Sequence, residues 1–353
     1  MSASTLLSTV GTSLLGSEGL MELRLLLARL ENLDWSDRSA GAELNSLALL
    51  QRGGFVDSDC RVHYFLSDSP EGDLVGQALR KIIGDNRVVL HTVRDLDPRQ
   101  PDRFARFGLA RLAQEQCRVL SGLDTRYCAL DATGGFKAQA GIAVSLGQAL
   151  QIPVYYRHET FDRIIALPPL PLSLDTELWC RHAGLFFELA DGLSSLTDLP
   201  LDPRLRGMLD WAPEDDHYLV SLNSTGVIFH EVLRQRWPEV SLNLLPRPAA
   251  KKSLVRLSDH GWPDRQRLLD TMQKLLERVP YITRCHGAYL NPGLPRPSTF
   301  LIKDECLHAR CSDGTYTVGF AVRTTARNRT QLEACLADLL ERLEQDGADK
   351  WLW

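Results

Sequence analysis

The chain has 353 residues, of which 44% are hydrophobic and 24% are charged, and its formal net charge is -5 at pH 7. This length accommodates two or three domains, and the hydrophobic share excludes an intrinsically disordered protein. No apolar run reaches the ~20 residues of a membrane-spanning helix, and no basic segment of a signal peptide precedes the first leucines. Eight scattered cysteines are typical of a reducing compartment, so we expect a cytoplasmic protein.

The charge is unevenly distributed along the chain. Residues 251–353 carry 16 Lys+Arg and 13 Asp+Glu, a net +3, which leaves -8 for residues 1–250. A basic C-terminal part permits a nucleic-acid partner. A chance fluctuation in surface charge explains the same numbers equally well.

Strands and helices alternate over the first 156 residues. Apolar runs predict strands at 5–15 (broken at Gly11), 61–66, 87–93, 128–130 and 153–156. Helical spacing of apolar residues predicts helices before 32 and at 40–50, 73–83, 102–122 and 138–150. This alternation indicates an α/β, Rossmann-like fold, a doubly wound parallel sheet that binds ligands at the carboxyl ends of its strands.

Three polar turns follow these strands, at 11–13, 67–69 and 133–137. In the last turn two glycines let the backbone approach a phosphate, and Lys137 adds a cation where helix N–H groups attract anions. None of the turns has the spacing of a dinucleotide fingerprint or a Walker A loop. Ordinary turns and helix N-capping remain the alternative.

The segments 11–15 and 132–137, with the proline-rich stretch 167–172 and the later 219–226, resemble the CARF domains of CRISPR type III accessory proteins. The resemblance covers about residues 1–240. It implies a Rossmann-like two-fold dimer that binds cyclic oligoadenylate across the dimer seam. The implied ligand-binding residues are Gly11, Thr12, Ser13, Leu14, Ser67, Asp68, Thr133, Gly134, Gly135, Phe136 and Lys137.

The middle of the chain no longer shows the regular alternation of strands and helices. Its pattern predicts a helix at 179–196, an acidic loop at 210–216, a strand at 219–222, a helix at 227–236 and a linker at 245–250. We interpret residues 166–250 as a small, winged-helix-like connector.

The last hundred residues predict a compact α+β module. The expected order is a short strand at 253–257, a helix from Pro263 to 278, strands at 281–286, 299–303 and 306–311, a hairpin turn at 312–314, a strand at 316–324 and a helix at 331–345.

This module carries many cationic side chains and no recognisable metal-binding pattern. Cys285, His286, Cys306, His308 and Cys311 lack zinc-binding spacing, and strand alternation puts them on opposite faces. No cluster of carboxylates for a metal-dependent nuclease is evident. Cations on the strands can hold an RNA backbone and stabilise a pentavalent phosphate, although charges that protect an edge strand from aggregation are the alternative.

The segment 318–329 and the leucine-rich helix after it are similar to the last strand and helix of the RelE toxins, small ribonucleases that cut mRNA in the ribosomal A site. The resemblance covers about residues 253–345. It implies that Arg327 is a transition-state arginine and Lys303 a strand lysine, with Arg310 as a second arginine. Glu333 stands near the usual tyrosine, so Glu333, His308 and Glu305 all remain possible general bases.

Together these patterns predict a CARF domain (1–165), a connector (166–250) and a RelE-like domain (251–353) in a homodimer without cofactor or metal. Cyclic oligoadenylate, expected to be the tetra-adenylate, would activate ribosome-dependent mRNA cleavage in CRISPR type III antiviral defence. The alternatives are a ring nuclease in which Ser13 and Lys137 degrade the messenger, a transcription regulator that binds DNA, and a metal-dependent nuclease.

Overall fold

The computed structural model describes residues 2–15, 22–253, 257, 264–291 and 296–352. The chain divides into two compact units, one of Met1–Leu174 with Leu193–Val232, the other of Asp175–Gly192 with Leu233–Trp353. Residues of the expected connector occur in both units, and the three-domain division stays a prediction. None of the helices in the described ranges is long and apolar enough to span a membrane.

A six-stranded sheet forms the centre of the first unit. The strand order is β3-β2-β1-β4-β5-β6, and every neighbouring pair is parallel except the edge pair β5–β6. The strands are β1 (Ala3–Thr9), β2 (Val56–Ser67), β3 (Val88–Val93), β4 (Cys128–Asp131), β5 (Val154–Tyr156) and β6 (Ile165–Leu167). The expected α/β, Rossmann-like sheet is therefore present, with an antiparallel edge strand before the prolines.

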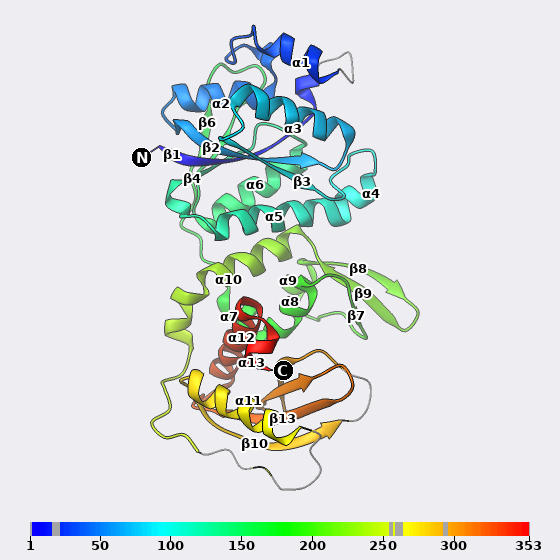
Figure 1. Cartoon of the computed structure of the whole chain (residues 1–353), viewed down its shortest axis with the longest axis vertical. Helices are drawn as coiled ribbons and strands as arrows, with labels where there is room; N and C mark the ends of the chain where they lie inside the picture. Colours follow the sequence, from blue (N-terminus) through cyan, green and yellow to red (C-terminus); the bar gives the residue numbers. More distant parts are fainter. Residues whose placement is uncertain (1, 16–21, 254–256, 258–263, 292–295, 353) are drawn as a thin grey trace. The chain divides into compact units, whose positions relative to one another are not determined.

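Helices lie on both faces of this sheet, with α2 and α3 on one face and α5 and α6 on the other (Figure 1). The helices are α1 (Leu23–Leu30), α2 (Ala42–Arg52), α3 (Pro70–Ile83), α4 (Pro101–Arg103), α5 (Leu109–Ser121) and α6 (Lys137–Leu150). Leucines, valines and alanines of β1, β2 and α1–α3 form one buried cluster. The expected helix at 102–122 is interrupted by a π-helical turn at Phe104–Gly108, and Gly108 at its end packs against the backbone of Asp95.

A small antiparallel sheet, β7-β9-β8, completes the first unit. It contains β7 (Ser194–Leu196), β8 (Leu209–Glu214) and β9 (His217–Leu222), with the short helix α9 (Pro203–Arg206). The expected acidic loop at 210–216 was wrong, since most of it is β8, paired residue by residue with β9. Cross-strand pairing overrides the weak strand propensity of Asp210 and Pro213.

The helix after β9 is longer than expected. α10 (Ser224–Leu244) continues through Pro238, where the sequence predicted an end at 236. Trp237 is buried and donates a hydrogen bond to Asp338 at 3.1 Å. This tertiary contact stabilises the helix where its own backbone bonding is interrupted.

The second unit has a four-stranded antiparallel sheet in the order β10-β13-β12-β11. Its strands are β10 (Ile282–Asn291), β11 (Thr299–Lys303), β12 (Cys306–Ser312) and β13 (Thr317–Thr324), and its helices are α7 (Thr176–Arg181), α8 (Ala183–Ala190), α11 (Arg265–Arg278), α12 (Arg329–Asp346) and α13 (Ala348–Trp351). The apolar face of the sheet, with Phe300, Leu307, Val318 and Phe320, is buried. The predicted α+β arrangement is present, whereas Pro263 and most of the expected strand 253–257 lie outside the described residues.

Candidate functional site

The fold brings the three polar turns of the N-terminal part to one edge of the sheet. β1 lies between β2 and β4, and Thr9 pairs with Phe65 while Ser8 pairs with Asp131. All three strands run in the same direction, so residues 11–14, 67–68 and 133–137 follow neighbouring carboxyl ends. We call this edge of the first unit the carboxyl rim.

Two of the turns pack backbone against backbone. A Cβ on Gly134 would lie 2.4 Å from the carbonyl oxygen of Thr9, and a Cβ on Gly11 would lie 3.1 Å from the amide nitrogen of Gly135. The hydroxyl of Thr9 donates to the carbonyl of Gly134 at 2.7 Å. Gly135 has a φ of 87°, a region that L side chains rarely adopt. Glycines at these positions therefore let the two turns pack against each other, and their contact with a phosphate stays a prediction.

Two carboxyl groups that the sequence analysis missed lie beneath the rim. Glu43 of α2 is 1% exposed and accepts from the Gly11 amide at 2.8 Å and from the Ser13 hydroxyl at 3.2 Å. Asp131 accepts from Ser8, Ser46 and the Thr133 amide. Burial raises the pKa of both carboxyl groups. In the sequence, Glu43 stands in the first turn of a helix that also contains Asn45, Ser46, Gln51 and Arg52, so no local signal distinguished it.

The predicted rim residues differ in what they offer a ligand. Thr12, Ser13, Asp68, Gly135 and Lys137 are exposed. Leu14 is buried in the core and Gly134 is also buried, so both contribute backbone geometry rather than side-chain contacts. The Gly11 amide and the Ser13 hydroxyl already bond to Glu43, so a ligand would have to use other donors or share these two.

An aromatic pair borders the glycine turn. Phe136 is 46% exposed and packs edge-on against Phe104 of the π-helical turn, with 5.7 Å between ring centroids. Lys137 begins α6 beside it. The rim thus combines a flat apolar surface with a cation.

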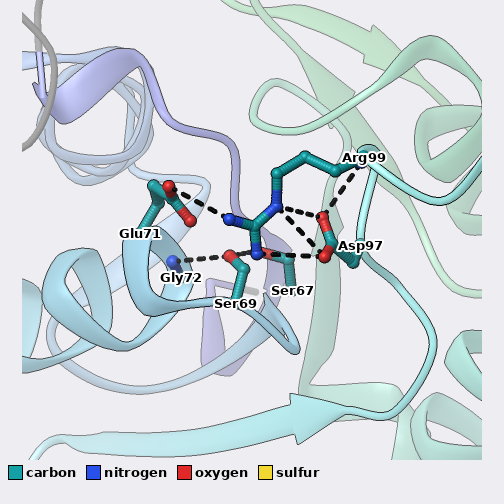
Figure 2. A network of polar contacts seen from close by, with 6 residues as sticks. All are labelled: Ser67, Ser69, Glu71, Gly72, Asp97 and Arg99. Carbon is teal, nitrogen blue, oxygen red and sulfur yellow. Dashed lines mark hydrogen bonds and ion pairs between the residues drawn. The ribbon is translucent and has the colours of Figure 1, made fainter.

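The turn after β2 is part of a polar network that sequence reasoning did not find (Figure 2). Ser67 and Ser69 share a hydrogen bond of 2.8 Å, and Ser69 caps α3 by accepting from the amide of Gly72 at 3.1 Å. Nearby, Arg99 lies between two carboxylates, with its Nε 3.0 Å from Asp97 and its Nη1 3.5 Å from Glu71. The hydrogen bonds from Arg99 lower the pKa of Asp97. The Arg99–Glu71 contact links the first turn of α3 to the loop after β3 at the rim.

In the second unit, Arg327 lines a pocket of about 650 Å³ at one end of the sheet. The lining residues are Thr283, Glu305, Cys306, Leu307, Val322, Arg323, Thr324, Ala326, Arg327, Asn328, Arg329 and Leu332. The pocket is therefore lined by three arginines, Arg323 on β13, Arg327 in the following loop and Arg329 at the first residue of α12, and several cations together suit a phosphate group. We call it the arginine pocket.

The other predicted catalytic residues lie elsewhere. Lys303 is exposed at the β11–β12 turn, paired with Cys306, which lines the arginine pocket. Arg310 lies farther along β12, opposite Thr299, and donates to the carbonyl of Pro297 at 2.9 Å. Glu333 is 5% exposed and forms ion pairs with Arg329 at 2.8 Å and Arg181 at 3.9 Å. The structure does not bring Lys303, Arg310, Arg327 and Glu333 together in one pocket.

The cysteines and histidines of the sheet separate as strand alternation requires. Cys285 and Cys311 are buried on the apolar face. Within the part of the chain that the structure describes, no group of three or more His, Cys, Asp or Glu side chains could hold a metal ion.

Similarity to known proteins is confined to part of the chain. Residues 38–170 match a family model described as CRISPR-associated protein (Cas_APE2256). The segment is similar to that family over less than half of the chain. The matched residues include β2 to β6 and the rim turns at 67–68 and 133–137, but neither the turn at 11–14 nor the arginine pocket, so the RelE-like character of the C-terminal part stays a prediction.

No curated protein matches the chain. Among solved structures, the chain is similar to Can2 from Sulfobacillus thermosulfidooxidans in complex with cyclic tetra-adenylate, with 12% identity and a TM-score of 0.27. The match covers 68% of this chain and 65% of the Can2 chain. A TM-score this low supports no conclusion about fold or function.

Proposed function

We propose that the protein is a cyclic-oligoadenylate-activated, ribosome-dependent endoribonuclease of CRISPR type III defence. The first unit would bind the messenger at the carboxyl rim, and the second unit would cut mRNA without a metal ion. The observation that carries the proposal is the convergence of three polar turns, from neighbouring parallel strands, at one edge of a sheet whose residues 38–170 match a CRISPR-associated family.

The chemistry of the rim supports a ligand with several phosphates and bases. The Gly134-Gly135 turn leads into the N-terminus of α6, where helix N–H groups attract a phosphate, Lys137 supplies a positive charge, and the exposed Phe136 ring supplies a stacking surface. A ring of four adenylates contains a two-fold axis, so a two-fold dimer of this chain would offer the same rim to each half. Cyclic tetra-adenylate is our choice of messenger on this ground.

The arginine pocket supports the nuclease half of the proposal. Arg323, Arg327 and Arg329 converge on one pocket with the hydroxyls of Thr283 and Thr324. Fixed cations aimed at a phosphate stabilise the charge that develops when the neighbouring 2′-hydroxyl attacks. The messenger would activate this site by binding one arrangement of the protein more tightly than another.

The test is incubation of the full chain with translating ribosomes and cyclic tetra-adenylate, with primer extension to detect cuts in the mRNA. We expect cuts only when the messenger is present. The absence of cuts with any cyclic oligoadenylate would contradict the proposal. Chromatography of the messenger after the same incubation distinguishes the ring-nuclease alternative, which predicts loss of the messenger and intact mRNA.

Two substitutions test messenger binding and RNA cleavage separately. Lys137→Ala should weaken messenger binding, whereas Lys81→Ala, in a helix pair with Asp85, is the matched control and should leave it unchanged. Arg327→Ala should abolish cutting and retain messenger binding. Its control is Arg204→Ala, which removes an exposed arginine paired with Asp202 in the other unit.

A further inference from the structure

A second cluster of reactive side chains lies on the sheet of the second unit, outside the arginine pocket. The apolar face of this sheet carries Leu307, Val318, Phe320 and Val322, all buried. Strand alternation places the intervening residues of β10, β12 and β13 on the opposite face. We call this opposite surface the outer face.

The outer face is organised in rows that cross β10, β13 and β12. In one row His286 and His308 pair with Ala321 from its two sides. In the next row Tyr289 and Arg310 pair with Gly319 from its two sides. Each row therefore has a small residue in the middle and reactive or cationic side chains at its flanks.

The spacing of the histidines suits a phosphodiester between them. Adjacent strands lie ~4.8 Å apart, so two Cα atoms separated by one intervening strand are roughly 10 Å apart. Imidazoles that rise from both flanks leave room above Ala321 for one phosphate group. The two side chains are close enough for the charge of His286 to lower the pKa of His308.

Both imidazoles have an unused nitrogen. His286 Nε2 and His308 Nδ1 are buried atoms, and neither has a hydrogen-bond partner among the residues that the structure describes. These two nitrogens are shielded from solvent, so a ligand on the outer face would contact the other, exposed edges of the two rings. Both side chains are partly exposed as a whole, which leaves them accessible from solvent.

Tyr289 provides an aromatic surface beside the histidines. Its ring lies over Gly319, where a Cβ would come within 2.3 Å of the ring carbon Cζ. The ring centroid is 6.3 Å from that of His308, and the side chain remains exposed. A nucleobase can stack on such a ring while its phosphate lies in the histidine row.

Cations border this arrangement on both sides. Arg310 lies beyond Tyr289, and the exposed pair Arg284–Arg323 lies in the row on the other side of the histidines. Arg323 also lines the arginine pocket, so this side chain borders both the outer face and that pocket. A single RNA strand could pass across both.

We propose that His286 and His308 form an acid–base pair that cleaves single-stranded RNA on the outer face, with Tyr289 stacking a flanking base. This inference rests on the proposed ribonuclease function and names its reacting groups. His308 takes the proton of the 2′-hydroxyl as the 2′-oxygen forms a bond to phosphorus. The bond from phosphorus to the 5′-oxygen breaks, and the imidazolium of His286 gives its proton to that oxygen.

The products are a 2′,3′-cyclic phosphate and a 5′-hydroxyl, and no metal, oxidant or reductant is consumed. Arg310 and Arg323 lie in the rows on either side of the histidines, so positive charge borders the reacting phosphate. Burial and the neighbouring Lys303 lower the pKa of His308, which keeps its imidazole neutral for the role of base.

The test compares His286→Gln, His308→Gln and the control His217→Gln in the full chain with messenger and translating ribosomes. His217 lies on β9 in the first unit and serves as a histidine far from the sheet in sequence. We expect each outer-face variant to cut about 100-fold more slowly or worse, while the control cuts like the wild type. Thermal unfolding of all variants should be unchanged, since both side chains lack hydrogen-bond partners at the atoms concerned within the described residues.

Two outcomes separate this inference from the proposed function. If the wild type cuts and both outer-face variants cut within about threefold of it, the acid–base pair is overturned and the ribonuclease function stands. If the wild type cuts nothing, the proposed function fails, and titration with 2′-O-methyl RNA decides the inference. Shifts in the imidazole NMR signals of His286 and His308 then support an RNA site on the outer face, and unshifted signals overturn it.

Discussion

The carboxyl rim and the outer face are both built on sheets, but the two sheets assemble a site differently. At the rim, the turns after β1, β2 and β4 meet because parallel neighbours end at the same edge. On the outer face, His286 and His308 lie on either side of Ala321 because the antiparallel register pairs each of them with that residue. A parallel site can be located once strand ends are known, whereas an antiparallel site depends on register, which a shift of one residue would destroy.

Among substitutions that test this comparison, we expect the largest effect, on the rate of RNA cleavage, from a change at Arg327. Arg327→Ala removes a cation from the arginine pocket, and loss of one such charge from a phosphoryl transition state lowers the rate about 100- to 1,000-fold. Messenger binding, measured by calorimetry, should not change because the rim belongs to the other unit. A variant that cuts RNA at the wild-type rate would remove the arginine pocket from the mechanism.

The next largest effect is expected at Gly134. A Cβ there would lie 2.4 Å from the carbonyl oxygen of Thr9, so Gly134→Ala should destabilise the first unit by about 1–3 kcal/mol in urea unfolding. It should also weaken messenger binding, because the turn must open. The matched control is Gly141→Ala in α6, where nothing lies within 4 Å of the added Cβ.

Gly141→Ala should stabilise the chain by about 0.5–1 kcal/mol, because alanine is the better helix former. Equal changes in the free energy of unfolding for Gly134→Ala and Gly141→Ala would show that Gly134 is not closely packed against Thr9.

A smaller, pH-dependent effect is expected at Glu43. Burial raises the pKa of this carboxyl in the folded chain, so its contribution to stability is present below the unfolded pKa and is lost as the pH rises through the folded pKa. Between about pH 5 and pH 8, the free energy of unfolding should therefore fall more in the wild type than in Glu43→Gln.

Urea unfolding at both pH values measures this difference in slope, and Glu177→Gln, in the first turn of α7, serves as a control. At the lower pH, Glu43→Gln should change the free energy of unfolding by about 1 kcal/mol, because the substitution alters the hydrogen bonds that Glu43 accepts from Gly11 and Ser13. Parallel slopes for the wild type and Glu43→Gln would contradict the raised pKa.

The smallest effect is expected at Arg99. Arg99 and Arg126 each pair with an aspartate two residues earlier, but Asp97 is buried whereas Asp124 is largely solvated. Arg126→Ala should change stability by less than about 1 kcal/mol, as for other surface pairs, and Arg99→Ala should destabilise the chain somewhat more. Only Arg99→Ala should weaken messenger binding, by a few-fold in low salt, because only Arg99 is part of the rim network (Figure 2).

The amount that could be predicted from the sequence differs between the two regions. Strand–helix alternation predicted the parallel sheet, and the glycines and Lys137 predicted the rim, because these signals are local in the chain. Glu43 was missed, since its partners Gly11 and Ser13 are about 30 residues away. The acidic stretch 210–216 was taken for a loop because its pairing with β9 depends on contacts, not on propensity.

In the second unit the residue types were visible in the sequence but their grouping was not. Lys303, Arg310, Arg327 and Glu333 were named together, yet only Arg327 lines the pocket and Glu333 is held in buried ion pairs. The sequence by itself determined the α/β alternation, the glycine turns and the cationic character of the last strands. The tertiary structure alone decided which of those side chains share a surface, because register and burial arise from contacts between residues that are distant along the chain.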